Sequence, residues 1–404
     1  MKNKKTILVL PGTKWQVELV KKIKENGHNV VVVNPAVDSP CFEYADNHLC
    51  SDIFNRNAVI SFAKENGVDA ILSDECDIAM NLIAELGEKL KVPALSPEMA
   101  SLFTDKFKMR EFSRKISLDY PKYKICESVK EAIEFQKELG KPIIIKPTDS
   151  NASHGVFKCE DEKEIISHFE ETISFSRINK KVLAEQYING TEFTIDGIKT
   201  PCGHFTLAIS EKKHFKHNPN ISNELFFTHY SSQFNYEELK RVNDLFVNSS
   251  DLNWGFTHAE YKFENGKFYL IEIAARGGGN MISSCITQHM SGFDTYQYLI
   301  DCSLGKIKDI NFSIPQSHKN KAAVLKFFET PKGGGIVKEI KGIDFLDRHP
   351  DIKYYQFNFS EGDEIEDALN DSARIGYFIA CCNDHKSLEL LMKEVNEKIK
   401  IEIK

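Results

Sequence analysis

Two glutamates that lie twelve residues apart interrupt runs that otherwise favour β-strands. Glu260 and Glu272 flank the dipeptide Asn265-Gly266, which is typical of a hairpin turn. A two-residue loop would send the two carboxylates to opposite faces, whereas the three-residue loop Glu264-Asn265-Gly266 would bring them to one face. We favour the three-residue loop, because Gly266 can supply the positive φ that a bulged loop needs. This register brings to one face His258, Glu260, Leu270, Glu272 and Ala274.

A cation between the two carboxylates is the chemistry that this arrangement predicts. Carboxylates that face the same way on neighbouring strands repel each other unless a cation lies between them. Oxygen ligands of this kind suit Mg²⁺ that carries the phosphates of a nucleotide. A solvated sheet face would explain Glu260, but it explains Glu272 poorly, since that residue lies between two isoleucines and shortly before a triple glycine.

A lysine at the end of a buried strand begins a second candidate site. Lys146 closes the apolar run 142–146, and a loop of small residues, 147–155, precedes the next strand. Backbone N–H groups in such a loop can point at a phosphate while the lysine adds positive charge. The loop is not a Walker A motif, which would end in Gly-Lys-Ser/Thr and lead into a helix. Taken alone, the loop is explained better as a plain hairpin turn.

The elements that must position these residues alternate at first between strand and helix. Short apolar runs at 6–10, 29–34 and 69–73 are separated by helical patterns. Repeated units of this length predict a parallel sheet with helices on both faces. A small α+β unit and a mostly β region follow, and a last α+β segment begins after Gly305. The chain is therefore predicted to contain several domains.

The bulk composition excludes several classes of partner. The chain has 404 residues with a net charge of −7, and no basic region stands out, so we expect no nucleic-acid partner. No apolar run approaches the roughly 18 residues that span a bilayer, so we expect no membrane insertion. The ten cysteines form no CxxC pair, which favours reduced thiols and a cytoplasmic location.

Further motifs stand in a fixed order around these two candidate sites. Thr104-Asp105-Lys106 precedes the Lys146 loop, Ala184–Ile188 and Gly190–Glu192 follow it, and Arg276 follows the second glutamate. Together the set resembles the ATP-grasp superfamily, in the branch that holds L-amino acid ligases, biotin carboxylase and carboxyaminoimidazole ribonucleotide synthase. The resemblance covers nearly the whole chain.

The resemblance implies an α/β and α+β chain with the ATP-grasp fold. A Rossmann-like pre-ATP-grasp domain would span residues 1–103, and the ATP-grasp domain would span 104–305. A mobile α+β lid would lie at about 118–188 inside it. A C-terminal α+β domain, 306–404, would pack on the ATP-grasp core.

The resemblance also implies an ATP-binding set, which consists of phosphate lysines, a lid loop, a hinge whose backbone reads adenine, and an acid for the ribose. In that order its members are Lys106 and Lys146; Ser153, His154 and Gly155; Glu185, Gln186, Tyr187 and Ile188; and Glu192.

The metal and the acyl phosphate are assigned to three further residues. Glu260 and Glu272 resemble the ligands of Mg²⁺ (or Mn²⁺), and Arg276 resembles the catalytic arginine that steadies the acyl phosphate or the substrate carboxylate. One position departs from the family pattern, which usually has asparagine where Ala274 stands. An alanine cannot ligate a metal, so a second magnesium would be less secure, or would be held by Glu272, phosphates and water alone.

The implied function is that of an ADP-forming ligase, which uses ATP to activate a small-molecule carboxylate as an acyl phosphate and couples it to an amine. Two alternatives stay open. One is a bicarbonate- or formate-using ATP-grasp enzyme of nucleotide biosynthesis, and the other is a non-catalytic nucleotide-binding homologue, which Ala274 favours. Segment 209–234 either shapes the acceptor pocket or is a solvated excursion. A homodimer is one expected assembly.

Overall fold

The computed structural model describes residues 4–150, 153–176, 180–219 and 221–404. Residues 151 and 152 of the expected lid loop therefore lie outside the described residues. Among those that are described, no helix is both long and apolar enough to cross a membrane.

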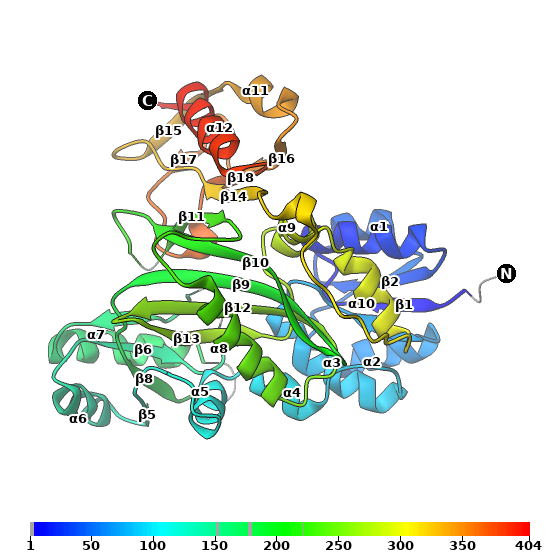
Figure 1. Ribbon diagram of the computed structural model, residues 1–404, viewed down its shortest axis with the longest axis horizontal. Helices are drawn as coiled ribbons and strands as arrows, with labels where there is room; N and C mark the ends of the chain where they lie inside the picture. The colour runs from blue at the N-terminus through cyan, green and yellow to red at the C-terminus, as the bar shows by residue number, and fades with distance from the viewer. Residues whose placement is uncertain (1–3, 151–152, 177–179, 220) are drawn as a thin grey trace.

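Parallel strands form the N-terminal layer, in the order β3-β2-β1-β4 (Figure 1). Its strands are β1 (Thr6–Val9), β2 (Asn29–Asn34), β3 (Asn47–Cys50) and β4 (Ala70–Leu72), and its helices are α1 (Val17–Glu25), α2 (Arg56–Glu65), α3 (Asp77–Leu90) and α10 (Thr295–Ser303). Successive strand residues point to opposite faces. Ile7 therefore packs with α1 and α10, and Leu8 packs with α2 and α3. The predicted parallel sheet with helices on both faces is confirmed.

The segment that is expected to form the lid, which we call the lid, is a small antiparallel sheet in the order β5-β8-β6-β7, with two helices on it. Its elements are β5 (Tyr123–Cys126), α6 (Val129–Leu139), β6 (Ile143–Pro147), β7 (Phe157–Cys159), α7 (Glu162–Ser174) and β8 (Val182–Gln186). Ser128 and Asp161 cap the two helices by accepting backbone N–H groups. Its buried core consists of residues 126–184 alone, so the lid is a separate packing unit.

The lid gives a prediction about motion. Because its core is separate from the rest, the module at about 118–188 should move as one body when Mg·ATP binds. Amide hydrogen exchange should slow in peptides that cover 146–157 when Mg·ATP is added. Peptides from the β1–β4 sheet should exchange at the same rate with and without nucleotide. Unchanged exchange in the lid peptides would contradict the lid assignment.

An antiparallel sheet of eight strands forms the centre of the molecule, in the order β13-β12-β9-β10-β11-β14-β18-β16. Its strands are β9 (Thr191–Thr200), β10 (Gly203–His214), β11 (Ser222–Phe227), β12 (Gly255–Glu264), β13 (Lys267–Ala274), β14 (Ala322–Phe327), β16 (Ile352–Phe357) and β18 (Gly376–Cys382). The helices beside it are α4 (Pro97–Leu102), α5 (Lys106–Lys115), α8 (Tyr236–Ser249) and α9 (Thr287–Ser291). Main-chain hydrogen bonds between β11 and β14 join the C-terminal strands to this sheet.

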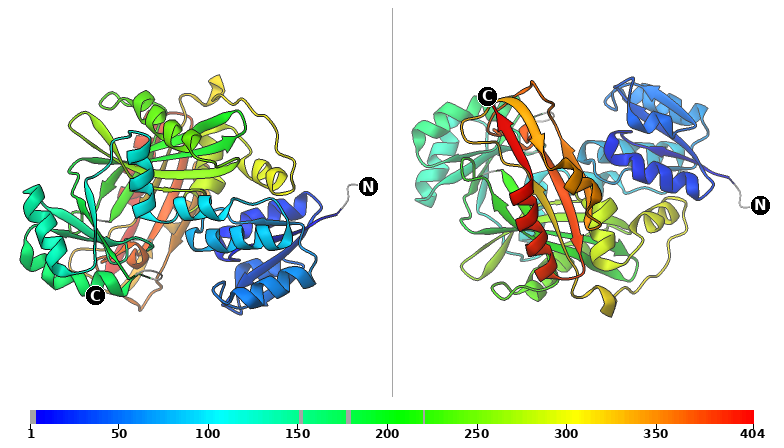
Figure 2. Two further views of the ribbon diagram at one scale, coloured as in Figure 1. Left: turned by 90° about the horizontal axis from the view of Figure 1, so that it is seen from below. Right: turned by 90° about the horizontal axis from the view of Figure 1, so that it is seen from above.

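The C-terminal segment adds a three-stranded sheet, in the order β17-β15-β19. Its elements are β15 (Gly335–Lys341), α11 (Ile343–Arg348), β17 (Glu364–Ile365), α12 (His385–Lys398) and β19 (Lys400–Ile403). Figure 2 shows α12 lying across the outer strands, on the side of the molecule opposite the lid helices. Leu388, Leu391 and Val395 of this helix are buried against β14 and β18.

The β12–β13 hairpin differs from the prediction. Its loop consists of Asn265 and Gly266 alone, and Glu264 pairs with Lys267, so the predicted three-residue loop is wrong. Both loop residues have positive φ, 51° and 79°. Positive φ at both positions gives a turn whose twist matches that of the strands, and asparagine followed by glycine tolerates it well.

A β-bulge nevertheless brings the two glutamates to one face. Tyr261 pairs with Leu270, but the next residue, Glu260, pairs with Glu272, which leaves Ile271 as the extra residue. The bulge reverses the alternation of side chains along β13. Glu260 and Glu272 therefore lie directly opposite each other on one face. Leu270 packs into the core instead of joining them, which corrects the expected set.

Candidate active site

Two neighbouring cavities meet at the paired glutamates. The first, which we call the lid cavity, lies between the lid and the central sheet and measures about 130 Å³. The predicted residues that line it are Lys106, Lys146, Ser153, Glu185, Gln186, Tyr187, Ile188, Glu192, Glu260 and Glu272. The second, the inner cavity, measures about 280 Å³ and is lined by Ser153, Glu260, Glu272 and Arg276 together with residues from both ends of the chain.

Both predicted phosphate lysines are buried and paired with carboxylates. Lys106 begins α5, and its Nζ donates to the Ser150 carbonyl at 2.6 Å and to Glu272 Oε1 at 2.9 Å. Lys146 is the penultimate residue of β6, next to the lid loop, and its Nζ lies 2.5 Å from Glu185 Oε2. Burial lowers the pKa of Lys146 to about 8, although Glu185 opposes this shift. The side chain is therefore expected to change its charge near pH 8.

The lowered pKa of Lys146 gives a prediction about pH. Its pKa lies below the ordinary value of 10.5, so the charge is present below about pH 8 and is lost as pH rises through that value. A bound phosphate favours the charged form. We expect Mg·ATP to bind more weakly at pH 9 than at pH 7, and to take up protons near pH 8. Calorimetry at pH 8 in two buffers of different ionisation heat measures the uptake. Lys146→Arg should show none, and the absence of uptake in the wild type would contradict the prediction.

A buried arginine that the sequence interpretation missed connects α5 with the lid strand β8 and with the hairpin strand β13. Arg110 of α5 is fully buried, and its Nε donates to Glu185 Oε1 at 2.6 Å. Its Nη2 donates to the carbonyl of Ile271, the bulge residue, at 2.5 Å. Burial would raise the pKa of Glu185, but Arg110 and Lys146 outweigh it and keep the pKa low. The signal in the sequence was an arginine four positions after Lys106, on the same face of the helix.

At two positions of the predicted hinge, Gln186 and Tyr187, the backbone N–H already donates to a main-chain carbonyl and is not free to bind adenine. The N–H of Gln186 donates to the Lys122 carbonyl at 2.8 Å, and that of Tyr187 donates to the Pro142 carbonyl at 3.2 Å. The Tyr187 ring lies 4.3 Å from the Lys158 ammonium. Of the other expected ATP contacts, His154 stacks on Phe175 and does not line either cavity.

Gly155 also lies away from both cavities, but its conformation needs glycine. Its φ is +72°, and a Cβ there would lie 2.9 Å from the Phe175 ring. The glycine therefore lets the lid loop turn tightly against Phe175, the residue that follows α7.

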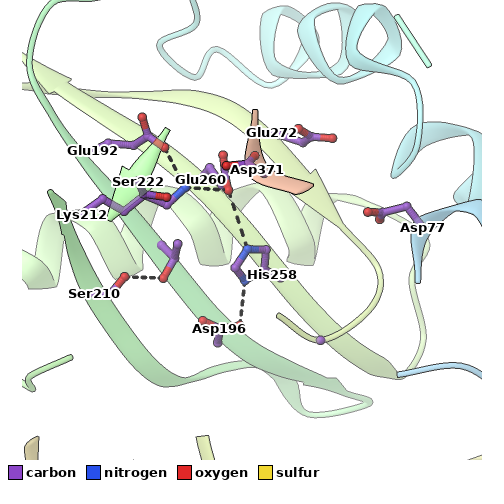
Figure 3. Close-up of polar contacts among 12 residues, drawn as sticks. Asp77, Glu192, Asp196, Ser210, Lys212, Ser222, His258, Glu260, Glu272 and Asp371 are labelled. Atoms are coloured by element: carbon purple, nitrogen blue, oxygen red, sulfur yellow. Dashed lines mark hydrogen bonds and ion pairs between the residues drawn. The ribbon is translucent and has the colours of Figure 1, made fainter. Parts of the chain in front are cut away.

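Charges of alternating sign run along the sheet face beside Glu260 (Figure 3). Lys212 Nζ bridges Glu192 Oε1 and Glu260 Oε1, at 2.7 Å from each. His258 Nδ1 lies 2.8 Å from Asp196 Oδ1, and His258 Nε2 lies 3.9 Å from Glu260 Oε1. Segment 209–234 thus supplies a charge to the site through Lys212.

Burial and neighbouring charges decide the ionisation of the charged side chains beside Glu260. Burial would raise the pKa of Glu192, but Lys212 outweighs it and the pKa falls to about 2. Burial would lower the pKa of His258, but Asp196 outweighs it and the pKa rises to about 9. The imidazole is therefore protonated at neutral pH, opposite Ala274 on the paired strand. Because Glu192 already faces a lysine, a ribose hydroxyl would have to share its carboxylate.

Arg276 is held by the N-terminal domain. Its Nε and Nη2 donate to the two carboxylate oxygens of Asp77 in α3, at 2.9 and 2.6 Å. Its Nη1 donates to the carbonyl of Gly277 at 2.8 Å. The first two glycines of the triplet permit close packing, since a Cβ at Gly277 would lie 2.4 Å from that of Ser283. The arginine therefore enters the inner cavity in a fixed orientation.

The C-terminal domain contributes residues to the inner cavity that the sequence interpretation missed. Asp371 and Arg374 line it together with Phe327 of β14. The lid touches this group directly, because the hydroxyl of Ser153 donates to Asp371 Oδ2 at 3.0 Å. The available signal in the sequence was an arginine directly before the apolar run 375–382.

The carboxylate pair has the chemistry of a hard-cation site. Within the described part of the chain, every hydrogen bond to Glu260 and Glu272 from a lysine goes to Oε1. The Oε2 atoms of the two opposed side chains make no hydrogen bond to another described residue. Two carboxylate oxygens beside the predicted phosphate lysines fit Mg²⁺ or Mn²⁺.

Two stretches of the chain match protein-family models. Residues 139–285 match the ATP-grasp domain, and residues 327–404 match the L-amino acid ligase C-terminal domain 2. Among solved structures, an L-amino acid ligase from Bacillus licheniformis superposes with a TM-score of 0.84 at 18% identity, over all of both chains. At that identity the likeness shows the fold, so the predicted ATP-grasp fold is confirmed.

Curated relatives are similar over shorter stretches. The carbamoyl phosphate synthase large chain of Clostridium acetobutylicum is 22% identical over 75% of this chain and 28% of its own length. Dapdiamide A synthase of Enterobacter agglomerans is 28% identical over 36% of each chain. The chain thus spans about a third of the length of these relatives.

Proposed function

We propose that this chain, which carries an ATP-grasp domain and an L-amino acid ligase C-terminal domain 2, is an ADP-forming ligase that joins a carboxylate to an amine. One observation carries the proposal. Glu260 and Glu272 are paired across neighbouring strands and line both cavities; Lys106 and Lys146 line the lid cavity, and Arg276 and Arg374 line the inner cavity. A nucleotide in the lid cavity would therefore present its terminal phosphate to a substrate in the inner cavity.

The residues of the site would bind, orient and exclude water. Lys106 and Lys146 would neutralise phosphate oxygens in the lid cavity, and Arg276 would hold the substrate carboxylate or the acyl phosphate with its planar fork. A divalent cation held by Glu260 and Glu272 would add positive charge at the phosphates. Closure of the lid would keep water away from the acyl phosphate. Catalysis is then mostly positioning and electrostatics.

A substrate screen tests the proposal. Purified protein with Mg·ATP receives pooled amino acids and small carboxylates, each with and without a pool of amines, and ADP release is measured. We expect release that depends on a carboxylate, and a product with a new carbon–nitrogen bond. Release with bicarbonate or formate alone would favour the nucleotide-biosynthesis alternative. ATP binding without release in any pool would favour the non-catalytic homologue, and either result would overturn the ligase.

Three finer points belong to the same proposal. The cation would be Mg²⁺ or Mn²⁺, with ATP as co-substrate. The ten cysteines are all free thiols, which supports a reducing, cytoplasmic location. The partners would be a small-molecule carboxylate and an amine, and the chain would assemble as a homodimer, which sedimentation can test.

A further inference from the structure

Four cations line the inner cavity, and their bonds differ. Lys212 bridges two carboxylates, and His258 pairs with Asp196. Arg276 donates from Nε and Nη2 to Asp77 and from Nη1 to the carbonyl of Gly277. Arg374, from the C-terminal domain, uses only Nη2, which lies 2.5 Å from Asp371 Oδ1 and donates to Ser222 Oγ at 3.1 Å. Arg374 therefore keeps more donor capacity than the other three.

The remaining donors of Arg374 have no partner in the described structure. Its Nε is buried without a hydrogen bond, and Nη1 makes none to another described residue. The side chain as a whole is 9% exposed. Burying a guanidinium with unused donors is costly unless a ligand completes them. Its plane lies over the Phe327 ring, with Cζ 3.8 Å from the ring centroid, so its orientation is set.

The contacts around Arg374 indicate which ligand would complete it. Asp371 lies between the arginine and the lid, since its Oδ1 faces Arg374 and its Oδ2 accepts from Ser153. Ser153 belongs to the loop that is proposed to cover the phosphates. Glu260 and Glu272, the proposed metal ligands, line the same cavity. A ligand at this place would lie within reach of the lid loop, the carboxylate pair and Arg374. The ligand that fits these surroundings is the negatively charged phosphate end of the nucleotide.

We infer that Arg374 binds the phosphoryl group while it passes from ATP to the substrate carboxylate, so that the C-terminal domain supplies a catalytic residue. The inference rests on the proposed function. In that step a carboxylate oxygen forms a bond to the γ-phosphorus as the bond from phosphorus to the β-phosphate oxygen breaks, and ADP leaves with the electron pair. Charge on the equatorial oxygens is then met by Arg374 from one side and by the lysines from the other.

The experiment uses a probe that needs no carboxylate. Aluminium fluoride with Mg·ADP imitates the phosphoryl group in transfer, and calorimetry measures ADP affinity with and without it. We expect the wild type to bind ADP more tightly with aluminium fluoride. Arg374→Gln and Arg374→Lys should lose at least tenfold of that gain, because neither supplies a planar fork. Their affinity for ADP alone should stay within about threefold of the wild type, as only the phosphoryl contact is removed.

A matched control is Arg348→Gln in the same domain, where the side chain is 82% exposed, and it should behave like the wild type. The inference is overturned if the wild type shows no gain, if Arg374→Gln keeps the gain, or if it weakens ADP alone to the same extent. A variant that keeps the gain but needs more amine for turnover would place Arg374 on the acceptor instead. If Arg374→Gln does not fold, Arg374→Lys serves as the test variant, because it keeps the positive charge and the aliphatic part of the side chain. If no carboxylate in the screen releases ADP but aluminium fluoride still tightens ADP binding through Arg374, the ligase proposal fails and the role of Arg374 in binding the phosphoryl group stands.

Discussion

Glu272→Ala should abolish carboxylate-dependent ADP release, and Glu260→Ala should reduce it severely. Each substitution removes one of two opposed carboxylates from a site that has few spare ligands, since Ala274 offers none. The loss should be steepest for Glu272, which also positions Lys106 through the 2.9 Å bond to its Oε1. ADP release measured across a range of Mg²⁺ and Mn²⁺ concentrations checks the prediction.

The controls separate metal binding from folding. Glu237→Ala removes a carboxylate on α8 that is 81% exposed, and its turnover should equal that of the wild type. Glu260→Gln keeps the size of the side chain and should still show a raised requirement for the metal. Thermal unfolding midpoints should confirm that each variant is folded. Turnover near the wild-type rate in Glu272→Ala would remove the metal assignment.

Arg276→Ala should lower kcat by roughly 10²–10³, by analogy with the loss of one donor to a developing oxyanion. Contacts to the transferring group strengthen as charge moves, so the rate should fall more than ATP affinity does. Arg276→Lys should recover little of the rate, because an ammonium cannot hold two parallel bonds. Pre-steady-state ADP formation, with ATP affinity measured separately, checks both statements. If ATP binding is lost while the rate per bound ATP is unchanged, Arg276 is a nucleotide ligand.

The ion pair with Asp77 adds a structural cost that must be separated from catalysis. The side chains of Arg276 and Asp77 are 14% and 17% exposed. Breaking a buried pair by removing one partner costs about 3–5 kcal/mol, much of it from the charge left behind. Asp77→Asn in the Arg276→Ala background removes that charge. The double variant should regain stability but no activity, whereas a regain of activity would make the arginine a structural residue.

Much of the fold follows from short-range patterns in the chain. Apolar runs alternating with helical periodicity predict the β1–β4 sheet, because burial on both faces requires that composition. Ser128 caps α6 by accepting from the N–H of Glu131, a bond that lies within one turn and so depends on short-range sequence alone. The sequence was enough to select several candidate site residues, because each stands in an ordered motif of the chain. They are Lys106, Lys146, Glu260, Glu272 and Arg276.

The register of the site hairpin was decided by tertiary structure. The predicted loop is wrong, and the two glutamates lie on one face of the sheet because of the bulge at Ile271. Nothing within the hairpin requires that bulge. The carbonyl of Ile271 accepts from Arg110, which lies in α5 and also holds Glu185 of the lid. A bulge that depends on a donor so far away in the sequence cannot be predicted from residue alternation along two strands.

Long-range ion pairing likewise decided which charges face the cavities. Lys212 of β10 pairs with Glu192 on the neighbouring strand β9, and its side chain reaches across β9 to Glu260 of β12. Arg374 reaches the inner cavity because the C-terminal strands continue the central sheet through β14. The sequence by itself determined which side chains could carry charge and which strands could form. The order of the strands in space decided which charges meet, because Coulomb and hydrogen-bond energies depend on distance across the fold and not on separation along the chain.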